Sequence, residues 1–241
     1  MRNHALLILL LLFAVIVEGC SGPQIPGTSP PSEGSYGTLT GIVTDEVSGL
    51  KLWSGTAAVG SQSVQIKDGG FEITNIPYGT YTLTIQKPFY EALTMQVVVN
   101  HKNIALTDLQ LQPIYNTSEM DLFARLVHAE AKGESYKGQV AVAATILNRV
   151  LHPDYPNTLY GVINEVVTVN GKKYYQYEPV LNGTINQPAG ESAKAAVYDA
   201  LAGWDPSLGA TGFFAPAKVG GSSWVWTRPM TITIGNHRFF K

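Results

Sequence analysis

The spacing of apolar residues changes near residue 116, and this change limits the fold more than any other feature of the sequence. Residues 38–114 contain short runs of alternating apolar and polar residues, separated by turn signals such as Asp68-Gly69-Gly70. From Thr117 onward, apolar residues recur every three or four positions, as they do on one face of a helix. The chain of 241 residues is long enough for two domains. The sequence therefore predicts an all-β domain at 38–114 and a helix-containing domain at 118–241.

The first twenty residues have the features of an export signal. Arg2 precedes thirteen consecutive apolar residues at 5–17, a run too short to span a bilayer comfortably but typical of a signal peptide. The sequence Val17-Glu18-Gly19-Cys20 resembles the cleavage site of bacterial lipoproteins, in which the Cys becomes the lipid-bearing N-terminus. We expect a signal peptide at 1–20 and lipid attachment at Cys20, with an ordinary signal peptide as the alternative.

Residues 21–37 are rich in Pro, Gly and Ser and contain few side chains to bury, so they are expected to form a flexible linker. The net charge of −2 provides no basic field for nucleic acid. A single cysteine cannot form an internal disulfide.

The alternating segments of the first domain predict strands around residues 39–43, 64–66, 71–74, 80–85, 95–99 and 104–109. The runs GIVTDEVSG, DGGFEITNIPYGTYTLTIQ and LTDLQLQP resemble the carboxypeptidase regulatory-like domain. This resemblance implies a seven-stranded, transthyretin-like β-sandwich without catalytic function. Tyr78 and Tyr90 are expected to pack or fill turns, with a glycan-binding face as the alternative.

Glu130 is the strongest candidate for a catalytic residue. Ser118, with Asp121 three positions later, predicts the start of a helix, and Gly133 predicts its end. Leu122, Leu126 and Glu130 fall on one face, so Glu130 lies at the end of the apolar stripe. Partial burial raises the pKa of a carboxyl group, as a glycosidase acid requires. The alternative from periodicity alone is a glutamate that points into water.

The following segments supply the rest of the predicted core. A nearly all-apolar helix is expected at 136–151, with Asn148 and Arg149 bonded to backbone groups of loops or, alternatively, to substrate. Asn170-Gly171 predicts a β-hairpin turn, and an amphipathic helix is expected at 189–202. Trp224 and Trp226 are expected to alternate on one strand and to pack in the core, with sugar stacking as the alternative.

The run LFARLVHAEAKGESYKGQVAVAATILNRVLHPDYPNTLYGVI resembles the spore cortex-lytic enzyme family of cell-wall hydrolases. ALAGWDPSLGATGFFAPAKV and SWVWTRPMTITIGNHRFF continue the resemblance to the C-terminus. It implies a lysozyme-like α+β fold and cleavage of the MurNAc–GlcNAc β-1,4 bond of peptidoglycan, as a lytic transglycosylase with one glutamate as acid and base. By motif position that glutamate is Glu130. The family also implies activity on the spore cortex during germination.

The same resemblance suggests substrate-contacting residues. The segment 176–180 is similar to a Gln-aromatic-x-Pro-Val run of the family, which makes Gln176, Tyr177 and Glu178 candidates for glycan contact. Trp226 is a further candidate for substrate binding. Phe213-Phe214 departs from the family, which commonly has tyrosines and an Asn there, so substrate preference and activity are both in question.

Two other functions remain open from the sequence. A muramidase-type hydrolase needs a second carboxylate, for which Glu134, Glu165, Glu178 and Asp205 are candidates. A catalytically weak wall-binding module is the other alternative.

No metal or cofactor is expected, because His128 and Glu130 are two positions apart on a helix and face different directions. The expected partners are peptidoglycan strands and, through Cys20, the outer face of the cell or spore membrane.

Overall fold

A computed structural model of the chain describes residues 35–241, all of which belong to one compact unit. The predicted signal peptide, the lipid attachment at Cys20 and the predicted linker up to residue 34 lie outside the described residues. The linker was predicted to extend to Gly37, and this is wrong, because the first strand already begins at Tyr36. None of the described helices is both long enough and apolar enough to cross a membrane.

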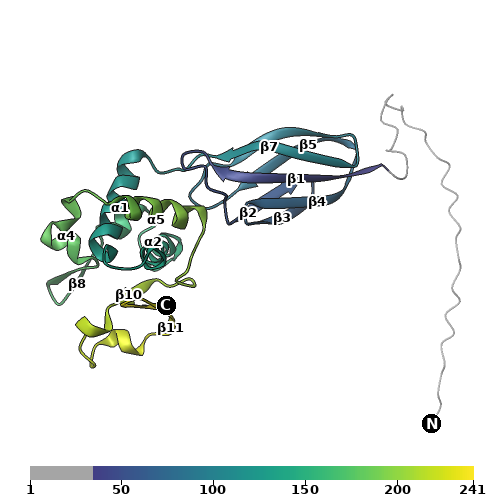
Figure 1. Cartoon of the computed structure of the whole chain (residues 1–241). Helices are drawn as coiled ribbons and strands as arrows, with labels where there is room; N and C mark the ends of the chain where they lie inside the picture. The colour runs from purple at the N-terminus through teal and green to yellow at the C-terminus, as the bar shows by residue number, and fades with distance from the viewer. Residues whose placement is uncertain (1–34) are drawn as a thin grey trace, which may run out of the picture. The chain divides into compact units, whose positions relative to one another are not determined.

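The N-terminal part of the described chain is built from seven strands in one sheet, in the order β6-β5-β2-β3-β4-β1-β7 (Figure 1). The strands are β1 (Tyr36–Asp45), β2 (Ser54–Val59), β3 (Gln62–Lys67), β4 (Gly70–Pro77), β5 (Gly79–Gln86), β6 (Leu93–Val99) and β7 (Asn103–Leu111). All six predicted strands are confirmed. The sequence did not predict β2, because its residues Ser-Gly-Thr-Ala-Ala-Val are mostly small and have little strand preference. Pairing with β3 and β5 holds it in the sheet.

The sheet consists of two halves around one core. Only the pair Lys67–Gly70 joins β3 to β4, so the sheet bends there. The edge strand β6 also contacts β1 and β7 of the other half. Alternate residues of β1, among them Leu39 and Val43, are fully buried, and Leu83 and Ile85 of β5 are buried with them. Burial of these aliphatic side chains from both halves stabilises this part of the chain.

The C-terminal part contains five α-helices, three 3-10 helices and five short strands among the described residues. The helices are α1 (Thr117–Ala131), α2 (Tyr136–Leu151), α3 (Leu159–Ile163), α4 (Glu178–Asn182) and α5 (Glu191–Ala202), with η1 (Thr184–Asn186), η2 (Pro216–Lys218) and η3 (Trp224–Thr227). The strands are β8 (Val166–Val169), β9 (Lys172–Tyr175), β10 (Gly212–Phe214), β11 (Met230–Ile234) and β12 (His237–Phe240).

The start of α1 differs from the prediction. Asn116, not Ser118, is the N-cap, and its side chain accepts hydrogen bonds from the backbone N–H groups of Ser118 and Glu119. The Glu119 side chain accepts in return from the Asn116 backbone N–H, which completes a capping box. The helix therefore begins at Thr117, and it ends one residue before the cap residue Lys132.

The central helix α2 is buried on nearly all sides, as predicted, and packs against α1, α3 and α5. The amphipathic helix predicted at 189–202 is found as α5, with Ala193, Val197 and Leu201 buried. The predicted hairpin is also found. Asn170 and Gly171, both with positive φ, join β8 and β9, and every residue of these two strands is exposed.

Trp224 and Trp226 do not lie on a strand, so this prediction is wrong. Both belong to the 3-10 helix η3, which is not part of the three-stranded sheet β10-β12-β11. Trp226 donates a hydrogen bond from Nε1 to the Gly220 carbonyl, and its ring meets the Phe214 ring edge-on, with centroids 4.9 Å apart. These local contacts, and not strand alternation, fix the two indoles.

Candidate active site

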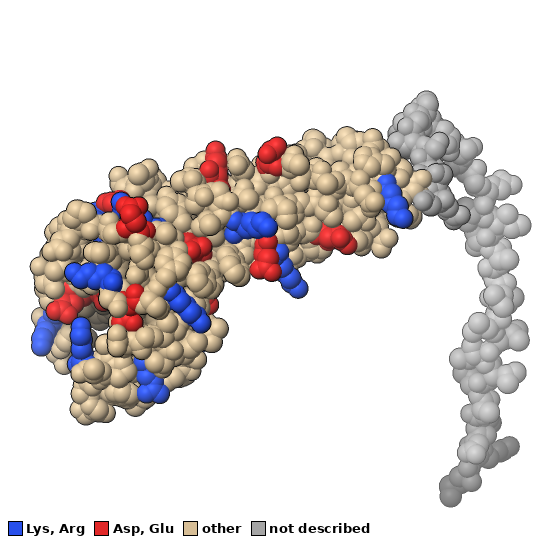
Figure 2. All heavy atoms as spheres, viewed as in Figure 1, with Lys and Arg blue, Asp and Glu red and all other residues tan. Residues whose placement is uncertain are grey.

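An open cavity of about 530 Å³ lies in the C-terminal part, at the end of α1. Figure 2 shows acidic and basic side chains gathered around a hollow in this part of the surface. The lining comes from five separated parts of the chain: residues 128–132, Arg149 of α2, residues 176–187, residues 213–219 and His237. The cavity is therefore assembled by the tertiary fold, because its lining residues lie far apart in the sequence.

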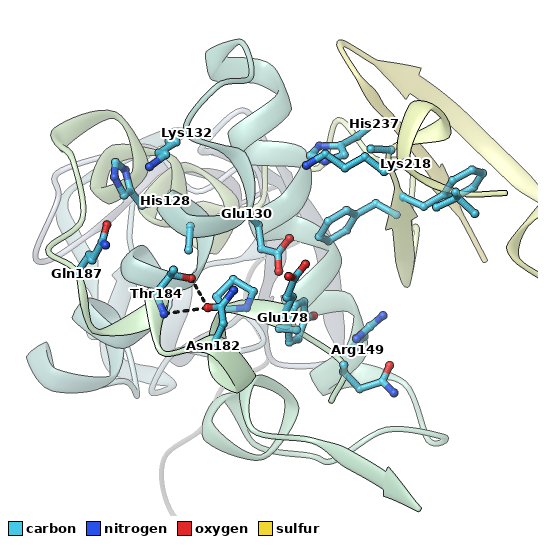
Figure 3. A pocket seen from close by; sticks show the side chains of 18 residues that line it. His128, Glu130, Lys132, Arg149, Glu178, Asn182, Thr184, Gln187, Lys218 and His237 are labelled. Atoms are coloured by element: carbon cyan, nitrogen blue, oxygen red, sulfur yellow. Dashed lines mark hydrogen bonds between the residues drawn. The ribbon is translucent and has the colours of Figure 1, made fainter. Parts of the chain in front are cut away.

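Glu130 projects into this cavity from the last turn of α1 (Figure 3). The pKa of its carboxyl group is raised to about 7, mainly by burial and also by the negative charge of Glu178, against the opposing effect of Lys218 and Arg149. The carbonyl end of α1 also disfavours a negative charge at this position. At neutral pH a substantial fraction of Glu130 is thus protonated and can donate a proton.

The four candidates for a second carboxylate occupy different environments. Glu134 accepts hydrogen bonds from the backbone N–H and the side-chain amide of Asn236, so it ties the turn between β11 and β12 to the loop between α1 and α2. Asp205 accepts from Ser207, Gly209 and Asn148 within a loop. Glu165 does not line the cavity. Only Glu178 lines it, and its carboxyl group points toward that of Glu130 (Figure 3).

Arg149 and Tyr177 form the floor on one side of the cavity. Arg149 donates from Nε to the Thr211 carbonyl, and its guanidinium lies 5.2 Å from the centre of the Tyr177 ring and 5.0 Å from that of Tyr155. Asn148 bonds the Ala210 carbonyl. Asn148 and Arg149 therefore both satisfy loop carbonyls, as predicted. The Tyr177 side chain is only 2% exposed, and burial raises its pKa to about 12.

Basic side chains surround the two carboxylates. Lys218 and His237 lie on one side of Glu130, and His128 lies toward the other, near Gln187 (Figure 3). Burial lowers the pKa of His237, while the nearby Glu134 raises it and Lys218 lowers it. The His128 Nδ1 accepts a hydrogen bond from the Gly190 backbone N–H, which joins α1 to the start of α5. The described residues contain no group of three or more His, Cys, Asp or Glu side chains arranged to hold a metal ion.

The structure brings Glu130, Gln176, Tyr177 and Glu178 together at one cavity, and it leaves Trp226 outside the lining. Phe213 and Phe214, which the sequence marked as a departure from the family pattern, both line it. The sequence did not indicate Lys132, Lys218 or His237. Lys218 and His237 have no recognisable local motif, whereas Lys132 is close to Glu130 in the sequence, at the C-cap of α1.

Comparison with protein families gives a match to the model described as Cell Wall Hydrolase at residues 133–240. This match begins three residues after Glu130. Spore cortex-lytic enzymes of Bacillus cereus and Bacillus subtilis are 43% and 41% identical to the chain over 127 and 125 residues. These alignments cover 53% and 52% of this chain but only 46% and 38% of the relatives, so the chain matches less than half of their length.

Two solved structures give a similar result. The catalytic domain of the germination-specific lytic transglycosylase SleB from Bacillus anthracis is 42% identical, with 53% of this chain and 98% of that chain aligned and a TM-score of 0.47. The catalytic domain of the Bacillus cereus SleB protein is also 42% identical, with 53% of this chain and 92% of that chain aligned and a TM-score of 0.46. By sequence, the C-terminal half of the chain is therefore similar to the cell wall hydrolases, and this half contains the cavity with Glu130.

Proposed function

We propose that the chain cleaves the β-1,4 bond between MurNAc and GlcNAc in peptidoglycan as a lytic transglycosylase, with Glu130 as both acid and base. The observation that carries this proposal is a carboxyl group whose pKa is raised to about 7 by burial at the wall of an open cavity. An acid of this kind is suited to protonating a glycosidic oxygen near neutral pH. The similarity to lytic enzymes of the bacterial wall indicates the substrate class.

The reaction can proceed with one carboxyl group. Glu130 donates its proton to the glycosidic oxygen, and the C1–O bond of MurNAc breaks to leave positive charge at C1. The Glu130 carboxylate then takes the proton from the 6-hydroxyl of the same sugar while that oxygen bonds to C1. The product carries a 1,6-anhydro ring, no water is consumed, and Glu130 is protonated again for the next cycle.

Gln176 and Glu178 are proposed to contact the glycan, because both line the cavity beside Glu130. The buried ring of Tyr177 contacts the Arg149 guanidinium and so supports this side of the cavity. Trp226 does not line the cavity, so it would contact only a glycan strand long enough to extend beyond the lining residues. The names of the relatives support the spore cortex as the natural substrate and germination as the occasion of its cleavage.

The remaining parts of the chain are proposed to place this activity at the wall. Residues 1–20 would direct export, and Cys20 would carry a lipid that holds the protein at the outer face of the cell or spore membrane. The seven-stranded domain at 36–111 would act as a carboxypeptidase regulatory-like, transthyretin-like spacer. Metabolic labelling with a lipid precursor tests the anchor, since a Cys20→Ala variant that still takes up label would disprove it.

The activity is tested by digesting cortex and vegetative sacculi side by side with the full chain and with Glu130→Gln. We expect the wild type to release fragments that end in anhydro-muramic acid, detected by mass spectrometry, and the variant to release at least about a hundredfold less. Glu191→Gln, which removes a carboxylate from the exposed face of α5, serves as the control and should match wild type. Retained release by Glu130→Gln would refute the assignment of the acid, and wall binding without any release by wild type would indicate a binding module.

A hydrolase is the second candidate, because Glu178 also lines the cavity and its carboxyl group points toward that of Glu130 (Figure 3). A carboxylate in that place could activate water or attack C1 directly. The products distinguish the two reactions, since a hydrolase leaves reducing muramic ends and no anhydro ring.

A further inference from the structure

Glu130 and Glu178 form a pair of facing carboxyl groups at the centre of the cavity (Figure 3). Glu130 comes from the end of α1 and Glu178 from the first residue of α4. Among the described residues, no hydrogen bond or ion pair is formed by either side chain. Two carboxyl groups left without partners in a cavity are available to each other and to a ligand.

The backbone around Glu178 is held on both sides. The preceding Tyr177 is buried beneath the Arg149 guanidinium, and the following Pro179 is buried in the first turn of α4. The Gln176 backbone N–H also donates to the Glu165 carbonyl, which closes the base of the β8–β9 hairpin. With its two neighbours fixed in the protein, Glu178 is the residue of this segment that projects into solvent over the cavity.

The two carboxyl groups differ in their surroundings. Glu130 is partly buried, whereas Glu178 is exposed. Burial disfavours the charged form of Glu130, and the negative charge of Glu178 acts on Glu130 in the same direction. Paired carboxyl groups in unequal environments are a common way to divide acid and anion roles at one site.

We propose that Glu178 is a positioning residue for the Glu130 proton. Its negative charge favours the protonated form of Glu130 before the reaction, and it makes Glu130 a stronger base once the proton has been transferred. The inference rests on the proposed function, in which Glu130 must both give and take a proton. After Glu130 has donated its proton, two negative charges face each other, and this repulsion favours recapture of the proton from the sugar's 6-hydroxyl.

The other charged groups around Glu130 allow a test in which two substitutions should shift its titration in opposite directions. Lys218 of η2 and Arg149 of α2 both favour the ionised form of Glu130, against the effect of Glu178. His128 lies on the same helix, His237 lies beside Lys218, and Tyr177 lines the same cavity with a neutral hydroxyl. Lys218 is the better partner for the test, because Arg149 also supports the floor through its bond to Thr211.

The experiment compares Glu178→Gln and Lys218→Gln with wild type in the full chain. The carboxyl of Glu130 is titrated by carbon NMR with labelled glutamate, assigned by its loss in Glu130→Gln, and glycan release is measured across the same pH range. We expect the Glu130 titration and the alkaline limb of the activity profile to move to lower pH in Glu178→Gln, by about half a pH unit or more, and to higher pH in Lys218→Gln. Glu178→Asp should restore most of the shift, and Glu191→Gln should show none.

Superimposable titrations of wild type and Glu178→Gln would overturn the inference. Circular dichroism checks that each variant is folded, which we expect because Glu178 is exposed. The outcome is separable from that of the proposed function. Reducing ends from wild type together with a shifted titration would leave the charge effect in place and refute the transglycosylase. Anhydro ends from wild type together with an unshifted titration would support the transglycosylase and refute the charge effect.

Discussion

Tyr177 and Glu130 are both buried beside the cavity, but burial has different consequences for them. For Glu130 it changes the protonation state, because its pKa moves into the neutral range. The Tyr177 hydroxyl stays protonated at any physiological pH, since burial raises its pKa to about 12. Its oxygen is buried and, among the described residues, has no hydrogen-bond partner. Its ring, which lies under Arg149, is therefore the part of Tyr177 that contributes to the site.

This division of roles predicts a difference between two substitutions at Tyr177. Tyr177→Phe should change the free energy of unfolding by less than about 0.5 kcal/mol, because it removes a hydroxyl that makes no hydrogen bond. Tyr177→Ala should cost about 3 to 5 kcal/mol through the cavity it leaves under Arg149. Denaturant unfolding measures both. Glycan release by the Phe variant should stay near wild type, and a tenfold loss in a stably folded Phe variant would show instead that the hydroxyl contacts substrate.

At the scale of elements, the helix that carries Glu130 depends on how it starts. Asn116 satisfies two backbone N–H groups in the first turn of α1, and Glu119 returns a hydrogen bond to it. Glu130 lies fourteen positions after this cap in the sequence. Fraying at the start would shorten the helix but leave its last turn packed by the buried residues Phe123, Leu126 and Val127.

The corrected cap gives a second prediction. Asn116→Ala should lower the stability of the helical part by about 1 kcal/mol, whereas Ser118→Ala should have little effect, because Asn116 and not Ser118 is the N-cap. Loss of the helical signal at increasing denaturant measures the difference, since all described helices lie between residues 117 and 227. Equal effects of the two substitutions would contradict the cap assignment.

The β8–β9 hairpin is the element least integrated with the core. All eight side chains of the two strands are exposed, and the turn residues Asn170 and Gly171 adopt positive φ as a tight hairpin requires. Replacing residues 167–174 by Gly-Gly should therefore leave the thermal midpoint within about 2 °C of wild type, because no buried contact is removed. Glycan release should also persist. A large loss of release by a variant with an unchanged midpoint would assign the hairpin to substrate binding.

The elements show what the sequence could and could not predict. Helices and strands with clear apolar periodicity were predicted, and so was the place of Glu130 at the end of an apolar stripe. The strand β2 was missed because it has few bulky side chains and is held by its neighbours. The strand predicted for Trp226 was wrong, because local turns through Gly220 outweigh the residue preference of the two indoles. Lys218 and His237 reach Glu130 only through the tertiary fold, which leaves no trace in local spacing.

For the whole molecule, the site that is proposed to act on glycan also reduces stability. Glu130 is expected to titrate near its ordinary value in the unfolded chain, whereas its pKa is raised to about 7 in the folded protein. Between these two values the folded state binds more protons than the unfolded state, so the free energy of unfolding falls as pH rises. This cost is absent at acidic pH and is complete once the pH exceeds the folded pKa. An active-site carboxylate is thus retained at the expense of stability in alkaline solution.

This linkage predicts that Glu130→Gln is more stable than wild type at pH 8 and nearly equal to it at pH 4. Because a glutamine does not titrate, the difference should grow between pH 4.5 and 7 to roughly 3 kcal/mol, or less where solvent reaches the carboxylate. Denaturant unfolding followed by the helical signal at a series of pH values measures it. Glu91→Gln, at an exposed position outside the helical part, should show no such pH dependence. If the difference between Glu130→Gln and wild type were constant with pH, Glu130 would titrate as it does in the unfolded chain, and the electrostatic basis of the proposed acid would be removed.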